Sequence, residues 1–167
     1  TIGFVMSLHG IGKAGDNVTT NSTLSNKSPM RTTRQFTIRI ENASSSYVKE
    51  QAIPFTYSAA SGVFTGDIIL TDIVSGTYAI KLKTEGYLEK ILTEGVPAGG
   101  GGFFEIALVA GDINGDNKLD ALDYNEIVGC YNLPTSTDTC KLTDLNDDGL
   151  NNGIDYNLFL REIVGNK

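Results

Sequence analysis

Two acidic segments near the C-terminal end of the chain carry the side chains that could do chemistry. The first reads GDINGDNKLDALDYN from Gly111, and the second reads DLNDDGLNNGIDYN from Asp144. Asp144 lies 32 residues after Asp112, and the segments align from these residues without a gap, which indicates a duplicated unit. Both are rich in carboxylate and amide oxygens and lack His and Cys, so their chemistry favours Ca²⁺ over Zn²⁺ or Cu²⁺.

Within each copy the oxygen-bearing side chains fall at positions 1, 3, 5, 9 and 12, counted from Asp112 or Asp144. This is the ligand spacing of an EF-hand-type loop, in which position 7 contributes a backbone carbonyl. The first loop is predicted to bind calcium through Asp112, Asn114, Asp116, the Lys118 carbonyl, Asp120 and Asp123. The second is predicted to use Asp144, Asn146, Asp148, the Leu150 carbonyl, Asn152 and Asp155.

The repeat differs from a standard EF-hand in two respects. Position 12 is Asp in both loops, and no amphipathic helix precedes either loop, although a helical pattern follows each one. A duplicated loop-then-helix with Asp at position 12 resembles the dockerin (F-hand) module of secreted bacterial proteins, from Gly111 to about Val164. The resemblance implies two bound Ca²⁺ ions. The alternative, a pair of acidic surface turns, requires the same ligand pattern to arise twice in fixed register.

In many dockerins the residues at loop positions 10 and 11 are Ser-Thr and face a cohesin receptor. This chain departs from that pattern, with Ala121-Leu122 in the first loop and Gly153-Ile154 in the second. Apolar residues there could pack on the chain's own β domain, on another subunit, or on a cohesin of a more hydrophobic kind. These four residues are therefore a candidate interface.

The two cysteines, Cys130 and Cys140, both lie in the segment that connects the loops. One interpretation is a redox or metal-binding pair, and the other is a disulfide that closes a short, turn-rich segment. No His or further thiol lies nearby, and a disulfide suits an oxidising exterior, so we expect the disulfide. An extracellular or cell-surface location follows from the same argument.

Residues 1–110 are predicted to form an antiparallel β-sandwich. Apolar and polar residues alternate in 1–9 and 36–40, and further short β-like runs at 47–57, 63–73, 77–83, 87–92 and 103–109 are separated by turn residues. The expected fold is therefore α+β, with this sandwich followed by a small α-helical dockerin-like module at 111–167. The stretch SGTYAIKLKTEGYLEKIL also resembles a strand pair of carboxypeptidase-regulatory or transthyretin-like sandwich domains, which implies a structural spacer or binding module.

Two N-terminal features leave alternatives open. The first strand, 1–9, could pair within its own domain or be donated to the sheet edge of a neighbouring molecule. The polar segment Gly10–Arg31 could be an interaction loop or simply a flexible one. Four asparagines stand in Asn-x-Ser/Thr triplets and are possible glycan acceptors: Asn17, Asn21, Asn26 and Asn42.

Composition excludes several classes of function. The 167 residues carry a net charge of −7, which includes the predicted calcium ligands and offers no basic surface for nucleic acid. No apolar run approaches ~18 residues, so no membrane span is expected. The start at Thr1 rather than Met fits a processed or trimmed precursor.

The sequence gives no sign of an enzyme. His9 is the only histidine, and strand alternation places it on an exposed face, while no Ser or Cys lies in a nucleophile-elbow context. The favoured hypothesis is a secreted, calcium-binding structural subunit that assembles with copies of itself or with a cell-surface partner. The alternative is a docking module for a cohesin-like receptor. Glycan binding by the sandwich is a weaker third hypothesis, since the chain has no Trp.

Overall fold

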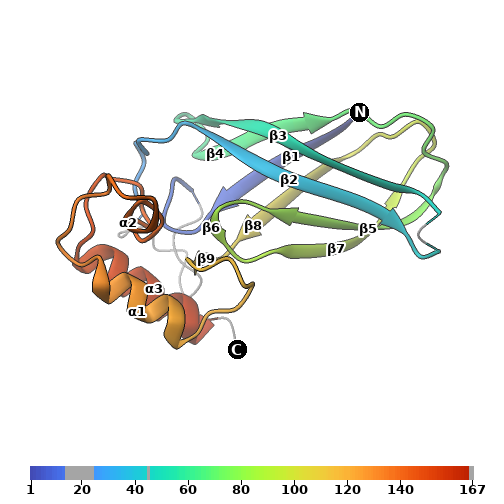
Figure 1. The fold of residues 1–167 in the computed structure, drawn as a ribbon. Helices are drawn as coiled ribbons and strands as arrows, with labels where there is room; N and C mark the ends of the chain where they lie inside the picture. Colours follow the sequence, from blue (N-terminus) through green and yellow to red (C-terminus); the bar gives the residue numbers. More distant parts are fainter. Residues whose placement is uncertain (14–24, 45, 166–167) are drawn as a thin grey trace.

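The computed structural model describes residues 1–13, 25–44 and 46–165, and they are mostly β with a helical C-terminal region (Figure 1). The strands are β1 (Ile2–Leu8), β2 (Thr33–Asn42), β3 (Val48–Ser58), β4 (Val63–Ile68), β5 (Gly76–Lys83), β6 (Gly86–Tyr87), β7 (Lys90–Val96), β8 (Phe103–Leu108) and β9 (Ala110–Asp112). The helices are α1 (Ala121–Gly129), α2 (Asp138–Leu142) and α3 (Gly153–Gly165). Among the described residues, no helix is both long and apolar enough to cross a membrane.

Seven of the strands form one continuous sheet, in the order β7-β5-β2-β3-β4-β1-β8. Neighbours run antiparallel except β1 and β8, which run parallel from Gly3 opposite Phe103 to Leu8 opposite Leu108. The hydrogen bonds do not divide the strands into the two antiparallel sheets of the predicted sandwich. The reason lies in β3, which pairs with β2 over most of its length and with β4 at its end, so it joins what would have been separate sheets.

The first strand lies inside this sheet and not at an edge. β1 is hydrogen-bonded to β4 on one side and to β8 on the other, and Ile2, Phe4, Met6 and Leu8 are buried. Donating β1 to another molecule would break both ladders. The structure therefore agrees with pairing of β1 within its own domain.

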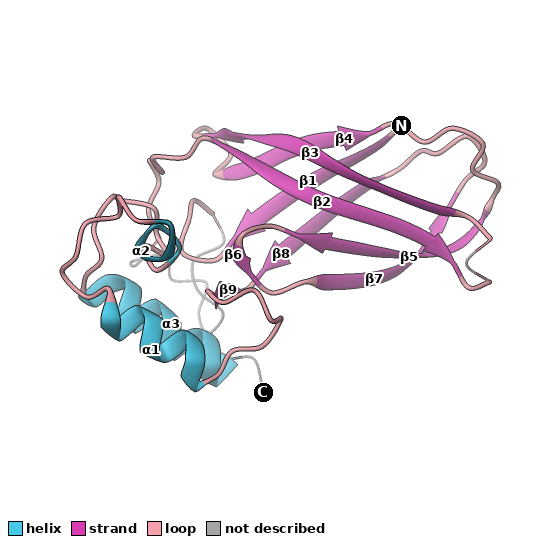
Figure 2. Ribbon diagram, viewed as in Figure 1, coloured by secondary structure: helices cyan, strands magenta, loops and turns pink. Residues whose placement is uncertain are grey.

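The helices gather at one end of the sheet, opposite the end where the N-terminus lies (Figure 2). The short strand β9 pairs with β6 and runs directly into the first acidic loop at Asp112. Apolar side chains of the C-terminal region, including Ile113, Leu145 and Phe159, belong to the same buried cluster as the inward side chains of the strands. The sheet and the helices therefore share one hydrophobic core.

Gly66 in β4 is required by a close aromatic contact. A Cβ at this position would lie 2.3 Å from Cδ1 of Phe55, whose ring is fully buried and sits 4.5 Å from the ring of Phe36. We expect Gly66→Ala to lower the free energy of unfolding by about 1–3 kcal/mol, because the packed rings cannot move without strain. Urea unfolding measures this change. Gly95→Ala in β7, where a Cβ would meet nothing within 4 Å, is the control, and equal costs for both variants would contradict the argument.

Candidate functional site

The two predicted calcium loops share the hydrogen bonds that their position-12 carboxylates accept. The position-12 carboxylate of Asp123 accepts from the N–H groups of Ile113, Asn114 and Asp120, at 2.8, 3.2 and 3.1 Å. The carboxylate of Asp155 accepts from the N–H groups of Leu145, Asn146 and Asn152, at 2.9, 3.2 and 2.9 Å. Each donor in the first loop has its counterpart 32 residues later, so the sequence repeat is also a structural repeat.

Both loops turn sharply at the same two positions. Position 4 has φ of 76° at Gly115 and 57° at Asp147, and position 6 has φ of 70° at Asn117 and 91° at Gly149. These left-handed turns suit Gly, Asn and Asp, and they direct the intervening N–H groups toward the loop's own side chains. Oδ1 of the position-3 asparagine accepts from the N–H of position 5 in both loops, at 2.8 and 3.1 Å.

The side chain at position 9 of each loop caps the helix that begins within the loop. Oδ1 of Asp120 accepts from the N–H of Leu122 at 2.8 Å, and Oδ1 of Asn152 accepts from the N–H of Ile154 at 2.7 Å. Such side-chain caps satisfy N–H groups that a helix leaves unpaired at its start. The side chains of each loop are therefore oriented by its own backbone and by the helix that follows.

The carboxylates at positions 1 and 12 are buried in both loops: Asp112, Asp123, Asp144 and Asp155. Burial raises the pKa of the Asp155 carboxyl to about 6, although hydrogen bonds from the N–H groups of Asn152 and Asn146 act in the opposite direction. Burial also raises the pKa of Asp144. A cation that binds Asp155 needs its ionised form, so a proton becomes a competitor as the pH falls through about 6.

These residues fit a hard divalent cation. The pKa values of the Asp144 and Asp155 carboxyls are raised by burial, and neighbouring carboxylates add to the effect, so calcium would supply a counter-charge there through the oxygen ligands it prefers. No three His, Cys, Asp or Glu side chains of the described residues already form a metal cluster. A site here would therefore draw on the asparagine amides and on the Lys118 and Leu150 carbonyls as well as on the carboxylates.

Lys83, which lies outside both acidic segments, reaches into the first loop. Nζ of Lys83, at the end of β5, pairs with Oδ2 of Asp112 and donates to Oδ1 of Asn117 at 3.1 Å. The N–H of Glu89 donates to the same Asn117 oxygen at 2.6 Å. The first loop is thus held against the sheet, and a metal ion there would compete with Lys83 for Asp112.

The second loop is held against the sheet by a different ion pair, centred on Asp147 at position 4. Oδ1 of Asp147 accepts from Nε of Arg31 at 2.6 Å, and Oδ2 accepts from the Arg31 N–H at 2.8 Å and lies 3.3 Å from Nη2 of Arg34. The Asp147 carbonyl accepts from the N–H of Met30 and from Nδ2 of Asn26. We call Arg31, Arg34 and Asp147 the Asp147 clamp. An acidic residue at a position outside the ligand set was the sequence signal that could have revealed it.

The structure places the candidate interface residues in two different environments. Ala121 and Leu122 at the start of α1 are exposed, with Leu122 at 58%. Gly153 and Ile154, their counterparts in the second loop, are half-buried, and Ile154 packs against the core. The two halves of the repeat are therefore not equivalent as surfaces. Cys130 and Cys140 form the expected disulfide.

The prediction that His9 is exposed was wrong. His9 follows β1 and is buried, with Nδ1 at 3.2 Å from Oε2 of the buried Glu162. Strand alternation missed this because α3, more than 140 residues later, covers the end of β1. His9 therefore belongs to the contact between sheet and helices.

Two of the four possible glycan acceptors, Asn17 and Asn21, lie outside the described residues. Nδ2 of Asn26 donates to the Asp147 carbonyl at 3.1 Å, and Nδ2 of Asn42 donates to Oγ of Ser46 at 2.7 Å. The nitrogen atoms that a glycan would use are thus engaged in hydrogen bonds at both described positions.

Comparison with known proteins gives a family for the C-terminal region. A model of the dockerin type I domain matches residues 110–163, so a dockerin type I domain is present in this part of the chain. No curated protein sequence matches the chain.

Solved structures extend the similarity to almost the whole chain. A C-terminal interface mutant of a type II cohesin–X–dockerin complex from Acetivibrio cellulolyticus contains a chain with 20% sequence identity and a TM-score of 0.53. An N-terminal interface mutant of such a complex, from the same organism, gives 16% identity and a TM-score of 0.55. Both alignments cover 97% of this chain and 95% of the other. At these identities the likeness establishes the fold alone.

Proposed function

We propose that this protein is a non-catalytic docking unit, in which a calcium-loaded dockerin module, carried by the β-sheet region, binds a cohesin-like receptor in a larger assembly. The observation that carries the proposal is the structural repeat, because two loops with coincident hydrogen bonds each lead into a helix. The dockerin type I match at 110–163 supports the same function. Cohesin is the partner in the complexes whose chains share this fold.

Calcium belongs to this proposal as the ion of both loops. Its ligands would be the twelve groups that the spacing predicts, from Asp112 to Asp123 and from Asp144 to Asp155. When bound, calcium would supply positive charge to the buried carboxylates, of which Asp112 already pairs with Lys83. The residues themselves hold the loop backbone, cap α1 and α3, and keep water from the position-12 carboxylates.

We further propose residues 1–110 as the presenting domain, 111–167 as the docking module, and an extracellular or cell-surface location. A disulfide in the module suits an oxidising compartment. The shared core and the direct connection through β9 support a fixed orientation of the module on the sheet. A fixed orientation favours binding because less freedom is lost when the receptor is engaged.

Self-assembly through a donated strand has less support, because β1 lies between β4 and β8. The exposed apolar side chains of α1, Leu122 and Val128, offer a better surface for a partner. Docking onto a separate receptor is therefore the function that we favour.

The deciding experiment is calorimetric titration of the protein with a panel of recombinant type I and type II cohesins, in calcium and after chelation. We expect calcium-dependent binding to at least one cohesin, and we expect Leu122→Asp to weaken it by at least about tenfold, because a charge would be buried in an apolar contact. Ile91→Asp is the control, since Ile91 is also exposed but lies on β7 of the sheet.

Light scattering on the same samples separates the alternatives. A monomer that binds cohesin supports docking. Calcium-dependent oligomers that bind none of the cohesins would overturn the proposal in favour of a self-assembling subunit.

A further inference from the structure

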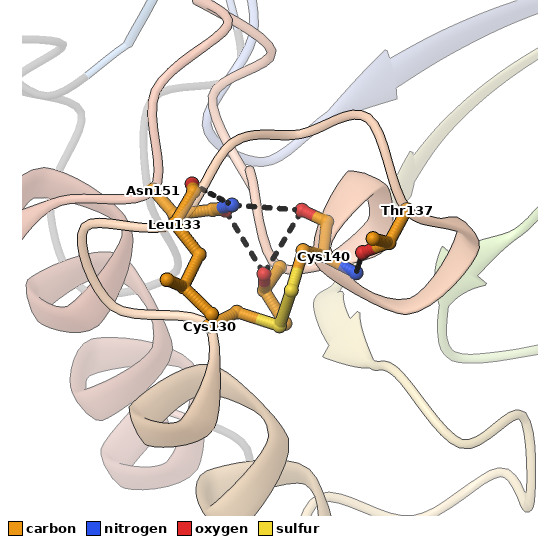
Figure 3. Close-up of a disulfide and its surroundings, with 6 residues drawn as sticks. Cys130, Leu133, Thr137, Cys140 and Asn151 are labelled. Atoms are coloured by element: carbon orange, nitrogen blue, oxygen red, sulfur yellow. Dashed lines mark hydrogen bonds between the residues drawn. A yellow bond between two sulfur atoms is a disulfide. The ribbon is translucent and has the colours of Figure 1, made fainter.

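The segment between the two cysteines packs against the second calcium loop. Pro134 forms an antiparallel β-bridge with Leu150, and the N–H of Asn132 donates to the carbonyl of Asn151 at 2.8 Å. Leu150 is the residue at position 7, whose carbonyl is the backbone ligand of the loop. We call residues 130–140, closed by the disulfide, the strap. Figure 3 shows the strap and Asn151 side by side.

The side chain of Asn151 connects the loop to the strap. Its Nδ2 donates to the carbonyls of Leu133 and Cys140, each at 3.0 Å, and its Oδ1 accepts from Oγ1 of Thr143 at 2.9 Å. The residue is 4% exposed, and both of its amide hydrogens are used. A buried amide with three such partners fixes the backbone on either side of it.

The first loop is built differently at this position. Its position 8 is Leu119, which packs against the hydrophobic core. In the first loop, Oδ1 of Asn117 accepts from Nζ of Lys83, which ends β5, and from the N–H of Glu89, which directly precedes β7. The sheet thus reaches position 6 of the first loop, whereas positions 7 and 8 of the second loop rest on the strap.

We propose that Asn151 is a positioning residue for the second calcium site, and that the disulfide-closed strap holds the Leu150 carbonyl in place through it. This inference rests on the proposed calcium-binding function. Opening the disulfide frees the strap, so the Asn151 amide loses its fixed partners and position 7 gains freedom. The second loop then binds calcium more weakly, whereas the first loop is unaffected. Loss of a group that orients metal ligands without touching the metal typically weakens metal affinity by about 10–100-fold.

The test compares the oxidised protein with protein reduced by dithiothreitol. In that reaction the protein disulfide takes up two electrons and two protons to give two thiols, and dithiothreitol is oxidised to its cyclic disulfide. Calcium titration by calorimetry should show two sites, of which one weakens by about 10–100-fold on reduction. Cys130→Ser with Cys140→Ser should reproduce this loss, and so should Asn151→Leu. Ser136→Ala, which changes an exposed side chain of the strap, should bind calcium like the unmodified protein.

Amide hydrogen exchange in saturating calcium, where the module is folded, gives a second readout that does not depend on the fitted calcium affinities. Reduction should speed exchange at the three amides that donate to Asp155 and leave unchanged the three that donate to Asp123. Equal changes in both loops, or none in either, would overturn the role of the strap. If neither loop binds calcium, both the affinity claim and the assignment of calcium to the loops are wrong. An exchange difference that persists in that case would show that the strap still holds the second loop and that only the calcium assignment failed. Loss of cohesin binding alone would count only against the proposed partner.

Discussion

Asp147→Ala is expected to lower the free energy of unfolding by about 3–5 kcal/mol, because it removes the only carboxylate that the described structure pairs with the buried guanidinium of Arg34. The side chains of Arg34 and Asp147 are 6% and 3% exposed, so water cannot replace the lost partner. The substitution also removes the acceptor for the Arg31 N–H and Nε. Urea unfolding followed by fluorescence and circular dichroism measures the effect.

The matched control is Gly115→Ala, at the same position of the first loop. Gly115 has a similar left-handed backbone, with φ of 76°, and a Cβ there would meet nothing within 4 Å. Gly115→Ala should lower the free energy of unfolding only by the backbone strain of about 1–2 kcal/mol, which an alanine at position 147 also experiences. Asp147→Asn keeps a residue type that tolerates this backbone and should fall between the two. Equal losses for the two alanine variants would show that the Asp147 clamp contributes nothing.

Removal of calcium is expected to unfold α1 and α3 before the sheet. Without the ion, the buried carboxylates of each loop repel one another. The folded module also loses the free energy of calcium binding, which is about 4 kcal/mol per site when the calcium concentration is a thousand times the dissociation constant. Circular dichroism after chelation should lose most of its helical signal and keep most of its strand signal.

Calcium added back should restore the helical signal, whereas magnesium should restore it poorly, since it binds reluctantly to sites of this type. A spectrum that chelation leaves unchanged would contradict the prediction. Loss of the strand signal in parallel would show that the shared core makes sheet and module one cooperative unit.

The features that the sequence predicted well depend on residues close together in the chain. The helices that follow each loop and the disulfide of Cys130 and Cys140 are set within short segments. The calcium ligand set remains a prediction. The alternating residues also placed most of the strands. The dockerin resemblance of the C-terminal region was confirmed by the family match.

The features that the sequence missed depend on contacts between distant segments. Strand patterns do not specify which strands pair, so the single sheet and the parallel pairing of β1 with β8 could not be foreseen. His9 became buried because α3 docks on it, and Lys83 reached Asp112 only because β5 ends beside the first loop. Asn151 carried a readable signal, since it is polar where the first loop has Leu119. The transthyretin-like resemblance was not confirmed.

The parallel pairing of β1 with β8 also sets an order of events during folding. Gly3 lies opposite Phe103, so the ladder joins residues separated by a hundred positions in the chain. Contacts of such sequence separation form late and slowly, because the entropy of closing the chain is lost before the contacts stabilise it. During synthesis, the edge of β1 that pairs with β8 therefore has no partner until β8 has been made. The first predicted calcium loop begins at Asp112, four residues after β8 ends, so completion of the sheet brings the dockerin module to the place where it folds.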